Sequence, residues 1–335
     1  MKLNNSSVPA VLAVTALAVA TSFTAEGAEY RVSGPQTYQN LSVFLIHGAN
    51  QPGAPRKFLT LQEALQQHKV VVYETGSVNE LAIENVSATE DVYIQSGEIV
   101  KGGQQDRTLK DDFILPTKSG KVPIASFCVE HGRWSRRGGE AVRNFESAPQ
   151  AVAAKQVKMA MRVASDQQQV WNAVSKAQDQ LSSVAGSVRA PASPTSYMLS
   201  LESPKLQQSI ENYIRDLAAA PNGSPDAIGY AFAVNGKINS AEVYASSELF
   251  RKLWPKLLRA SAVEAVSNFQ PGVTFEKPSF EAVRASLQDA DHGRSSARQV
   301  NSRTSVVTKE TERNVLFETR DQTQGGWVHR SYITK

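Results

Sequence analysis

KVVVYETGSVNELAIENVSATEDVYIQSGEIVKGGQQDRTLKDDFILPTKSGKVPIASFCV (residues 69–129) is the segment whose pattern indicates the fold class most clearly. It consists of short runs rich in β-branched and aromatic residues, separated by Gly, Asn, Ser and Asp. The runs recur about every ten residues, which is typical of strands joined by turns. The pattern predicts an antiparallel sheet, a sandwich or a barrel.

Two further signals precede this stretch. Leu41–Ile46 (LSVFLI) is an apolar run of strand length that ends at His47. Thr60 and Glu63 have the spacing of a capping box, in which each side chain binds the backbone N–H of the other residue at the start of a helix. We therefore expect a buried strand over residues 41–46 and a short helix over residues 60–67.

The composition of the chain and the spacing of its apolar residues change around Gly138. Residues 146–220 are rich in Ala, Gln and Lys and carry apolar residues at helical spacing, which predicts a mainly helical segment. Asn235-Gly236 lies between two β-prone runs and favours the type I′ turn of a β-hairpin. A helical pattern follows, so residues 228–266 are expected to form a hairpin and a helix.

These signals predict an α+β fold, in which an antiparallel β-rich N-terminal half packs with helices and a β-hairpin from the C-terminal half. The β-rich part covers residues 41–135. We expect residues 29–290 to form a single integrated domain. Residues 291–335 are interpreted as a polar linker followed by a C-terminal β-hairpin.

The first 28 residues have the features of a secretory signal peptide. Lys2 precedes an apolar core, Val8–Ala20, that is too short to cross a bilayer, and small residues follow this core. We expect cleavage near Gly27 or Ala28 and an exported protein, either periplasmic or secreted.

Length, charge and cysteine content exclude several classes of protein. The chain has 335 residues, enough for a sizeable core. Its formal net charge is +4 and no Lys/Arg block concentrates that charge, so nothing indicates nucleic-acid binding. No internal run is apolar for long enough to span a membrane. The lone cysteine, Cys128, cannot form an intrachain disulfide, so the fold depends on its core.

Most of the chemically capable side chains lie in two patches, Gly97–Arg107 (GEIVKGGQQDR) and Ser126–Arg137 (SFCVEHGRWSRR). Side chains alternate along a strand, so a strand through the second patch places Cys128 and Glu130 on one face. The same alternation in the first patch places Gln105 and Arg107 together, with glycines whose backbone amides can hold an anion. The alternative interpretation of the first patch is an edge strand that carries polar side chains without a binding role.

Cys128 has two interpretations. A nearby His131 and Arg133 would favour the thiolate and make the cysteine a nucleophile. The commoner case, which we favour, is a buried cysteine at a strand end that behaves as a small apolar residue. Cys128 and His131 alone are too few ligands for zinc, and we predict no metal site.

Glu130, Arg133 and Trp134 are stronger candidates than the thiol. A carboxylate beside a guanidinium orients both groups, and a Trp ring can stack on a planar ligand or on the arginine. With Gln105 and Arg107 they form the candidate ligand-binding set. The alternative is a salt bridge that closes a turn, with Trp134 filling the core.

The chain lacks the local signatures of common enzymes. There is no GxSxG, HExxH or CxxC sequence, and the glycines match neither a Walker pattern nor GxGxxG. The sequence therefore identifies no cofactor and does not decide whether the protein is an enzyme.

The two patches resemble segments of a known family. GEIVKGGQQDR is similar to a GE-hydrophobic-GG-x-Q-x-R segment, and SFCVEHGRW to an SCVExGRW segment, of the ARG-and-rhodanese-phosphatase-superfamily-associated protein domain family. Residues 228–259 and, less closely, VWNAV at 170–174 resemble later segments, so the resemblance covers about residues 41–266. The family is named for a genomic association with ADP-ribosylglycohydrolases and phosphatase-like proteins. This resemblance implies a link to ADP-ribose or nucleotide metabolism, although the export signal does not suit a cytoplasmic role of that kind.

Two functions follow from these observations. The first is an enzyme or binding protein that recognises an anionic small molecule, such as a nucleotide derivative, at a pocket of Gln, Arg, Glu and Trp side chains. The second is a non-catalytic periplasmic interaction or structural protein, in which the same side chains form a buried polar network. Convergence on an open pocket favours the first function, and mutual pairing away from any cavity favours the second.

Overall fold

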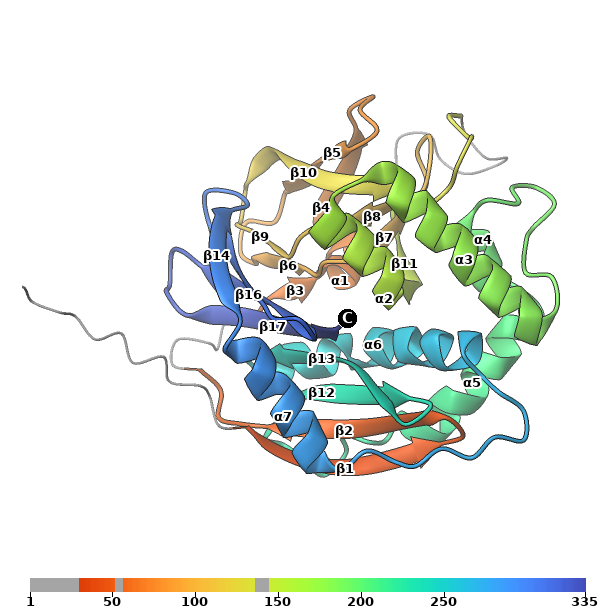
Figure 1. Cartoon of the computed structure of the whole chain (residues 1–335). Coiled ribbons are helices and arrows are strands. Elements are labelled where there is room, and N and C mark those ends of the chain that lie inside the picture. Colours follow the sequence, from red (N-terminus) through yellow and green to blue (C-terminus); the bar gives the residue numbers. More distant parts are fainter. Residues whose placement is uncertain (1–29, 52–56, 136–144) are drawn as a thin grey trace, which may run out of the picture.

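A computed structural model describes residues 30–51, 57–135 and 145–335 (Figure 1). The predicted signal peptide, residues 1–28, lies outside this range, as do Arg136 and Arg137. Helices and largely antiparallel sheets pack together, which confirms the α+β fold class. Among the described helices, none has the length and apolar character that crossing a membrane requires.

The largest of the sheets has eight strands in the order β1-β2-β12-β13-β17-β16-β15-β14, all antiparallel. The first half of this sheet consists of β1, β2, β12 and β13, which span Arg31–Tyr38, Leu41–His47, Ala227–Val234 and Lys237–Tyr244. The second half consists of β17, β16, β15 and β14, which span Trp327–Thr334, Asn314–Asp321, Thr304–Glu310 and Arg294–Gln299. Strands from both ends of the sequence thus share one sheet.

Two smaller sheets contain the β-rich region predicted from the opening stretch. A six-stranded sheet has the order β11-β7-β8-β10-β5-β4, with spans Glu146–Val152, Glu98–Lys101, Arg107–Leu109, Gly120–Cys128, Glu80–Asn85 and Val70–Glu74. A three-stranded sheet has the order β3-β6-β9, with spans Leu59–Thr60, Val92–Ile94 and Phe113–Leu115. The pair β3 and β6 is parallel.

The helices cover these sheets. They are α1 to α7 and one π-helix, η1, with spans Leu61–Gln66, Lys155–Met159, Ala160–Ala164 (η1), Gln167–Ala185, Tyr197–Leu201, Pro204–Leu217, Ser247–Ser267 and Phe280–Asp291. The capping box at Thr60 and Glu63 is present, as predicted. Asn235 and Gly236 both have positive φ, 52° and 74°, as a type I′ turn requires, so the predicted hairpin is also confirmed.

Alternation along β2 places its side chains on two buried faces of the eight-stranded sheet. On β2, Leu41, Val43 and Leu45 belong to the core under α6, whereas Phe44 and Ile46 belong to the core under α7. This is the period of two that a pleated strand imposes. A strand with both faces covered needs an almost continuous apolar run, which LSVFLI provides.

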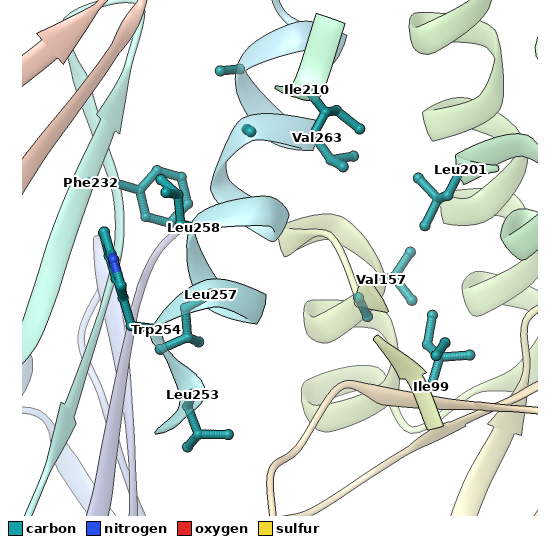
Figure 2. Close-up of a cluster of buried hydrophobic side chains, with 14 of the residues drawn as sticks. Ile99, Val157, Leu201, Ile210, Phe232, Leu253, Trp254, Leu257, Leu258 and Val263 are labelled. Atoms are coloured by element: carbon teal, nitrogen blue, oxygen red, sulfur yellow. The ribbon is translucent and has the colours of Figure 1, made fainter. Parts of the chain in front are cut away.

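Helix α6 lies between the eight-stranded sheet and the helical layer formed by α2, α3 and α5 (Figures 1 and 2). Trp254 and Leu258 on α6 lie toward Phe232 of β12, whereas Val263 lies toward Ile210 of α5 (Figure 2). Fully burying one such side chain contributes roughly 2 kcal/mol. Because α6 is buried on several sides, it organises the largest apolar core.

The segment that follows α7 is not the linker expected from its polar composition. Residues 294–299 form β14, an edge strand that pairs with β15 along its whole length. All six of its residues are exposed, and Arg298 forms an ion pair with Asp111. Polar and charged side chains are common on edge strands because they discourage pairing with other chains. Such a strand has no apolar alternation for sequence reasoning to detect.

The start of the segment predicted to be mainly helical, residues 146–220, is also different. Glu146–Val152 forms β11, which pairs with β7 at the edge of the six-stranded sheet. The expected helices begin only at Lys155, and α3 begins after Asp166, whose side chain accepts a hydrogen bond from the Gln169 amide. The helical part of the segment therefore begins only after β11.

Gly229 provides a test of the β12–β13 pairing. A Cβ atom at this position would lie 2.3 Å from the carbonyl oxygen of Glu242 and 2.8 Å from the Cα atom of Val243. Backbone atoms of a paired strand cannot move aside, so we expect Gly229→Ala to lower the free energy of unfolding by about 3 kcal/mol or more, measured by urea denaturation. Gly120→Ala is the control, because no atom lies within 4 Å of its Cβ position and only its positive φ, 63°, costs energy, about 1 kcal/mol. Equal losses in the two variants would contradict the close approach.

Candidate functional site

The two sequence patches meet in the six-stranded sheet. Strand β8 lies between β7 and β10, and Cys128 on β10 is directly opposite Arg107 on β8. The first patch is not one continuous edge strand, because β7 ends at Lys101 and β8 begins at Arg107. The residues between form a turn in which the Asp106 carboxylate accepts a hydrogen bond from the Gly102 amide at 3.1 Å. The edge-strand interpretation is therefore wrong.

Arg107 is enclosed completely and is surrounded by polar groups of this turn. Its Nη1 atom donates to the carbonyl oxygen of Gln105 at 2.9 Å. Its Nη2 atom lies 3.7 Å from Oε2 of Glu74, an ion pair without a direct hydrogen bond. The ring of Trp134 lies 5.3 Å from the guanidinium carbon, within the range of a cation–π contact. Arg107 therefore faces one carboxylate and one aromatic ring.

Glu130 and Arg133 form the ion pair that the sequence suggested. Nη2 of Arg133 lies 2.7 Å from Oε2 of Glu130, which is fully buried. The Ser193 hydroxyl donates a hydrogen bond to Oε1 of Glu130. The Thr195 hydroxyl donates to the carbonyl oxygen of His131 at 2.7 Å. These hydrogen bonds from Ser193 and Thr195 hold the loop 130–134 against the segment that follows α3.

The predicted ligand-binding residues thus lie together but are largely enclosed. Arg107 and Glu130 are inaccessible to solvent, and Gln105 is 3% exposed. Trp134, in contrast, is 44% exposed. Each arginine faces a carboxylate, so the cluster has little net charge. This arrangement is suited to holding the loop 130–134 in one conformation.

Cys128 lies at the end of β10 in a buried position. The Gln167 side chain binds both its backbone amide and its carbonyl oxygen at 2.9 Å, and the thiol faces the carbonyl oxygen of Val78 at 3.6 Å. Burial raises the pKa of the thiol to about 11. The neutral thiol is therefore the dominant form near neutral pH, which disfavours a nucleophilic role.

An open cavity of about 170 Å³ lies between the loop 130–134 and α3. Its lining includes His131 from the loop, Trp171 from α3 and Arg189 from the segment that follows α3. The rings of His131 and Trp171 meet edge to face with their centroids 4.5 Å apart. The indole Nε1 of Trp171 is buried and has no hydrogen-bond partner. An unpaired buried donor is costly, so an acceptor that reached this atom would be favoured.

A second polar centre lies deep in the protein, where the eight-stranded sheet meets the smaller sheets. His329 on β17 is buried, with Nδ1 2.7 Å from Oδ2 of Asp112 and Nε2 3.0 Å from Oε2 of Glu242 on β13. Lys158 on α2 adds a further charge to this series of ion pairs, since its Nζ atom lies 2.8 Å from Oε1 of Glu242. The Tyr244 ring stacks on the imidazole at 4.5 Å. Charges of alternating sign therefore form one continuous line.

The two carboxylates keep His329 protonated. Burial alone would lower the pKa of the imidazole, but the charges of Asp112 and Glu242 and their hydrogen bonds raise it to about 9. Burial would raise the pKa of Glu242, but Lys158 and His329 lower it to about 2. The pKa of Asp112 is lowered in the same way, chiefly by His329. The centre is thus an imidazolium held between two carboxylates.

Among the described residues, no group of three or more His, Cys, Asp or Glu side chains is placed to hold a metal ion.

The model of the ARG and Rhodanese-Phosphatase-superfamily-associated Protein domain matches residues 29–333, which is nearly the whole chain. The chain belongs to this family. The resemblance carried by GGQQDR and SFCVEHGRW is therefore confirmed, and the match extends past residue 266 to include β14 to β17. No curated protein and no solved structure matches the chain.

The cavity joins two segments through which the sequence resembles this family. His131 belongs to SFCVEHGRW, and Trp171, Asn172 and Val174 belong to VWNAV. The segments are far apart in the sequence and meet only in the folded chain. The open space beside the loop 130–134 is therefore the part of the site that sequence reasoning did not locate.

Sequence reasoning also missed the centre around His329. The five histidines share no ligand spacing, and the partners of His329 come from positions 112, 158 and 242. No local pattern connects these positions, because each lies on a different element.

We expect Cys128 to react slowly with thiol reagents. A pKa of about 11, raised by burial, leaves little thiolate near neutral pH. Labelling of the folded protein by iodoacetamide at pH 8 should be at least about a hundredfold slower than labelling in urea, followed by mass spectrometry. Labelling at similar rates in both conditions would restore the nucleophile hypothesis.

The buried imidazolium predicts a decrease in stability at alkaline pH. The folded-state pKa of His329, about 9, is above its usual value of 6.5, so its contribution is complete below pH 6.5 and is lost as the pH rises through 9. We expect the free energy of unfolding, from urea denaturation, to fall by roughly 3 kcal/mol across this range.

His329→Gln is the matched control, since glutamine can hydrogen bond but does not titrate. This variant should be less stable at pH 6 and should show a flatter profile between pH 6.5 and 9. A flat profile in the wild-type protein would show that His329 is not a buried cation.

Proposed function

We propose that the protein binds an anionic small molecule in the cavity between the loop 130–134 and α3. His131, Trp171 and Arg189 supply the contacts, and the ligand presents an acceptor oxygen to the indole N–H. The proposal keeps the ligand class expected from the sequence. It moves the contact surface from the enclosed residues Arg107 and Glu130 to the open side of the same loop.

The observation that carries this proposal is the Nε1 atom of Trp171, which is buried and has no hydrogen-bond partner. Leaving a buried donor unpaired costs about 1–3 kcal/mol, so the site favours any molecule that brings an acceptor to this atom. Phosphate and carboxylate oxygens are strong acceptors. Arg189 in the lining already pairs with Asp179 at 2.8 Å, so the unpaired indole N–H distinguishes the site more than this charge does. An anion therefore suits the cavity better than a neutral apolar group.

The volume of the cavity limits what enters it. Sites that enclose a drug-sized ligand usually measure about 300–1,000 Å³. At about 170 Å³, this cavity holds one phosphate or one ring, and the rest of a larger ligand extends outward. A terminal phosphate of a nucleotide derivative fits this description.

The enclosed residues act in this proposal by positioning the loop. Arg133 neutralises Glu130, which in turn accepts a hydrogen bond from Ser193. Removing one partner of a buried ion pair costs about 3–5 kcal/mol, because the other charge remains uncompensated. A loss of binding in Arg133→Ala would therefore report a damaged loop as readily as a lost contact.

The alternative is a structural or interaction protein that binds no small molecule. The complete enclosure of Arg107 and Glu130 favours it, because the cluster then serves only to join the loop, β8 and the segment after α3.

A thermal-shift screen against nucleotides, ADP-ribose and inorganic phosphate tests the proposal, because a ligand that binds the folded state raises the melting temperature. The decisive variant is Trp171→Phe, which keeps an aromatic ring against His131 but removes the N–H. We expect any anion that stabilises the wild-type protein to bind this variant about tenfold more weakly, because losing one hydrogen bond costs about 1.4 kcal/mol.

Trp134→Phe is the matched control, since Trp134 lies on the other side of the same loop over Arg107. It should leave ligand binding unchanged. If Trp134→Phe weakens binding and Trp171→Phe does not, the ligand contacts the Arg107 side. If no anion shifts the melting temperature, the structural alternative stands.

A further inference from the structure

A larger cavity, of about 490 Å³, lies at the tip of the β12–β13 hairpin, between α2, α3 and the end of α6. It shares no lining residue with the cavity beside His131. Its volume is in the range of about 300–1,000 Å³ that encloses whole small molecules. It is therefore large enough to be an independent binding site.

The charged side chains in its lining are mostly positive. Lys155 on α2, Lys176 on α3 and Lys237 on β13 contribute three positive charges, and Glu264 on α6 contributes one negative charge. Lys176 and Lys237 are exposed. Neither forms an ion pair within the part of the chain that the structure describes. The outer part of the cavity is thus suited to an anionic group.

The inner end of this cavity is different. Lys155, Asn239 and Glu264 also line a water-sized chamber of about 20 Å³, which adjoins the large cavity. Glu242 and Lys158, the end of the charge line from His329, line the same chamber. The cavity therefore passes from exposed lysines at the rim to an amide and a carboxyl group at depth.

Asn239 is aimed into this inner end by an irregularity of its strand. Phe232 is opposite Ser240 and Ala233 is opposite Ile238, so Asn239 is the extra residue of a β-bulge. The side chain is 8% exposed, and its Oδ1 atom is buried without a hydrogen-bond partner. An acceptor in this state is satisfied by an incoming hydroxyl group.

Glu264 lines the same two spaces as Asn239. Its carboxyl group accepts a hydrogen bond from the Lys155 backbone amide, and burial raises its pKa. A carboxyl group next to an amide can bind neighbouring hydroxyl groups of one molecule. Phe275 adds an aromatic surface to the cavity.

We propose that this cavity binds a phosphorylated sugar, with hydroxyl groups directed to Asn239 and Glu264 and the phosphate directed to Lys176 and Lys237. This inference is independent of the function proposed above, because it concerns a second site with a different set of residues. The ligand is distinguished from a simple anion by its hydroxyl groups and from a neutral sugar by its phosphate.

Calorimetric titration of the full chain with glucose 6-phosphate tests the proposal, with glucose and inorganic phosphate as separate probes. We expect glucose 6-phosphate to bind at least tenfold more tightly than either fragment. The double variant Lys176→Met/Lys237→Met should bind it at least tenfold more weakly, whereas Lys57→Met/Lys205→Met, which removes two exposed lysines elsewhere, should bind it as the wild-type protein does. Asn239→Ala should weaken binding of glucose 6-phosphate but not of phosphate.

Three outcomes would overturn the proposal. They are no binding of glucose 6-phosphate at millimolar concentration, equal binding by the two lysine double variants, and equal affinity for inorganic phosphate and the sugar phosphate. Trp171→Phe should leave this binding intact, so failure of the His131 cavity as a ligand site is distinguishable from failure of this one.

Discussion

The buried line of charges through Asp112, His329, Glu242 and Lys158 is the constraint on which the arrangement of the sheets depends. These side chains come from the residue before β9, from β17, from β13 and from α2. A buried charge without its partner is costly, so each group requires the next one at hydrogen-bonding distance. Apolar side chains can shift against one another with little loss of contact, whereas these ion pairs are lost when their charged groups move apart. The ion pairs therefore set the position of the small sheets and α2 against the large sheet.

The same line connects the scaffold to the deeper cavity. Glu242 and Asn239 lie on one strand, and Lys155 and Lys158 lie on one short helix. All four of these residues line the small chamber that adjoins the cavity. The groups at its inner end are thus held by elements that the charge line already fixes. The loop 130–134 is held separately, by Glu130 with Arg133 and Ser193, so the two candidate sites have independent supports.

Short-range signals explain which parts of the structure were predictable. The capping box at Thr60, the turn at Asn235-Gly236 and the apolar run of β2 each depend on residues close in sequence, and each was predicted. β14 was missed because an exposed edge strand has no apolar alternation. The pairing of Glu130 with Arg133 was predictable from their spacing, but the cavity beside His131 was not. That cavity depends on α3 packing against the loop, which no local pattern encodes.

The position of β17 has a consequence for the order of folding. This strand lies between β13 and β16 in the interior of the eight-stranded sheet, and it carries His329. Until residues 327–334 have left the ribosome, β13 has an unpaired edge, and the imidazolium that joins Asp112 to Glu242 is missing. β2 must likewise wait for β12, which follows it at a large sequence separation. Contacts of such long range make folding slow, so the nascent chain remains incomplete until this late strand inserts and closes the sheet.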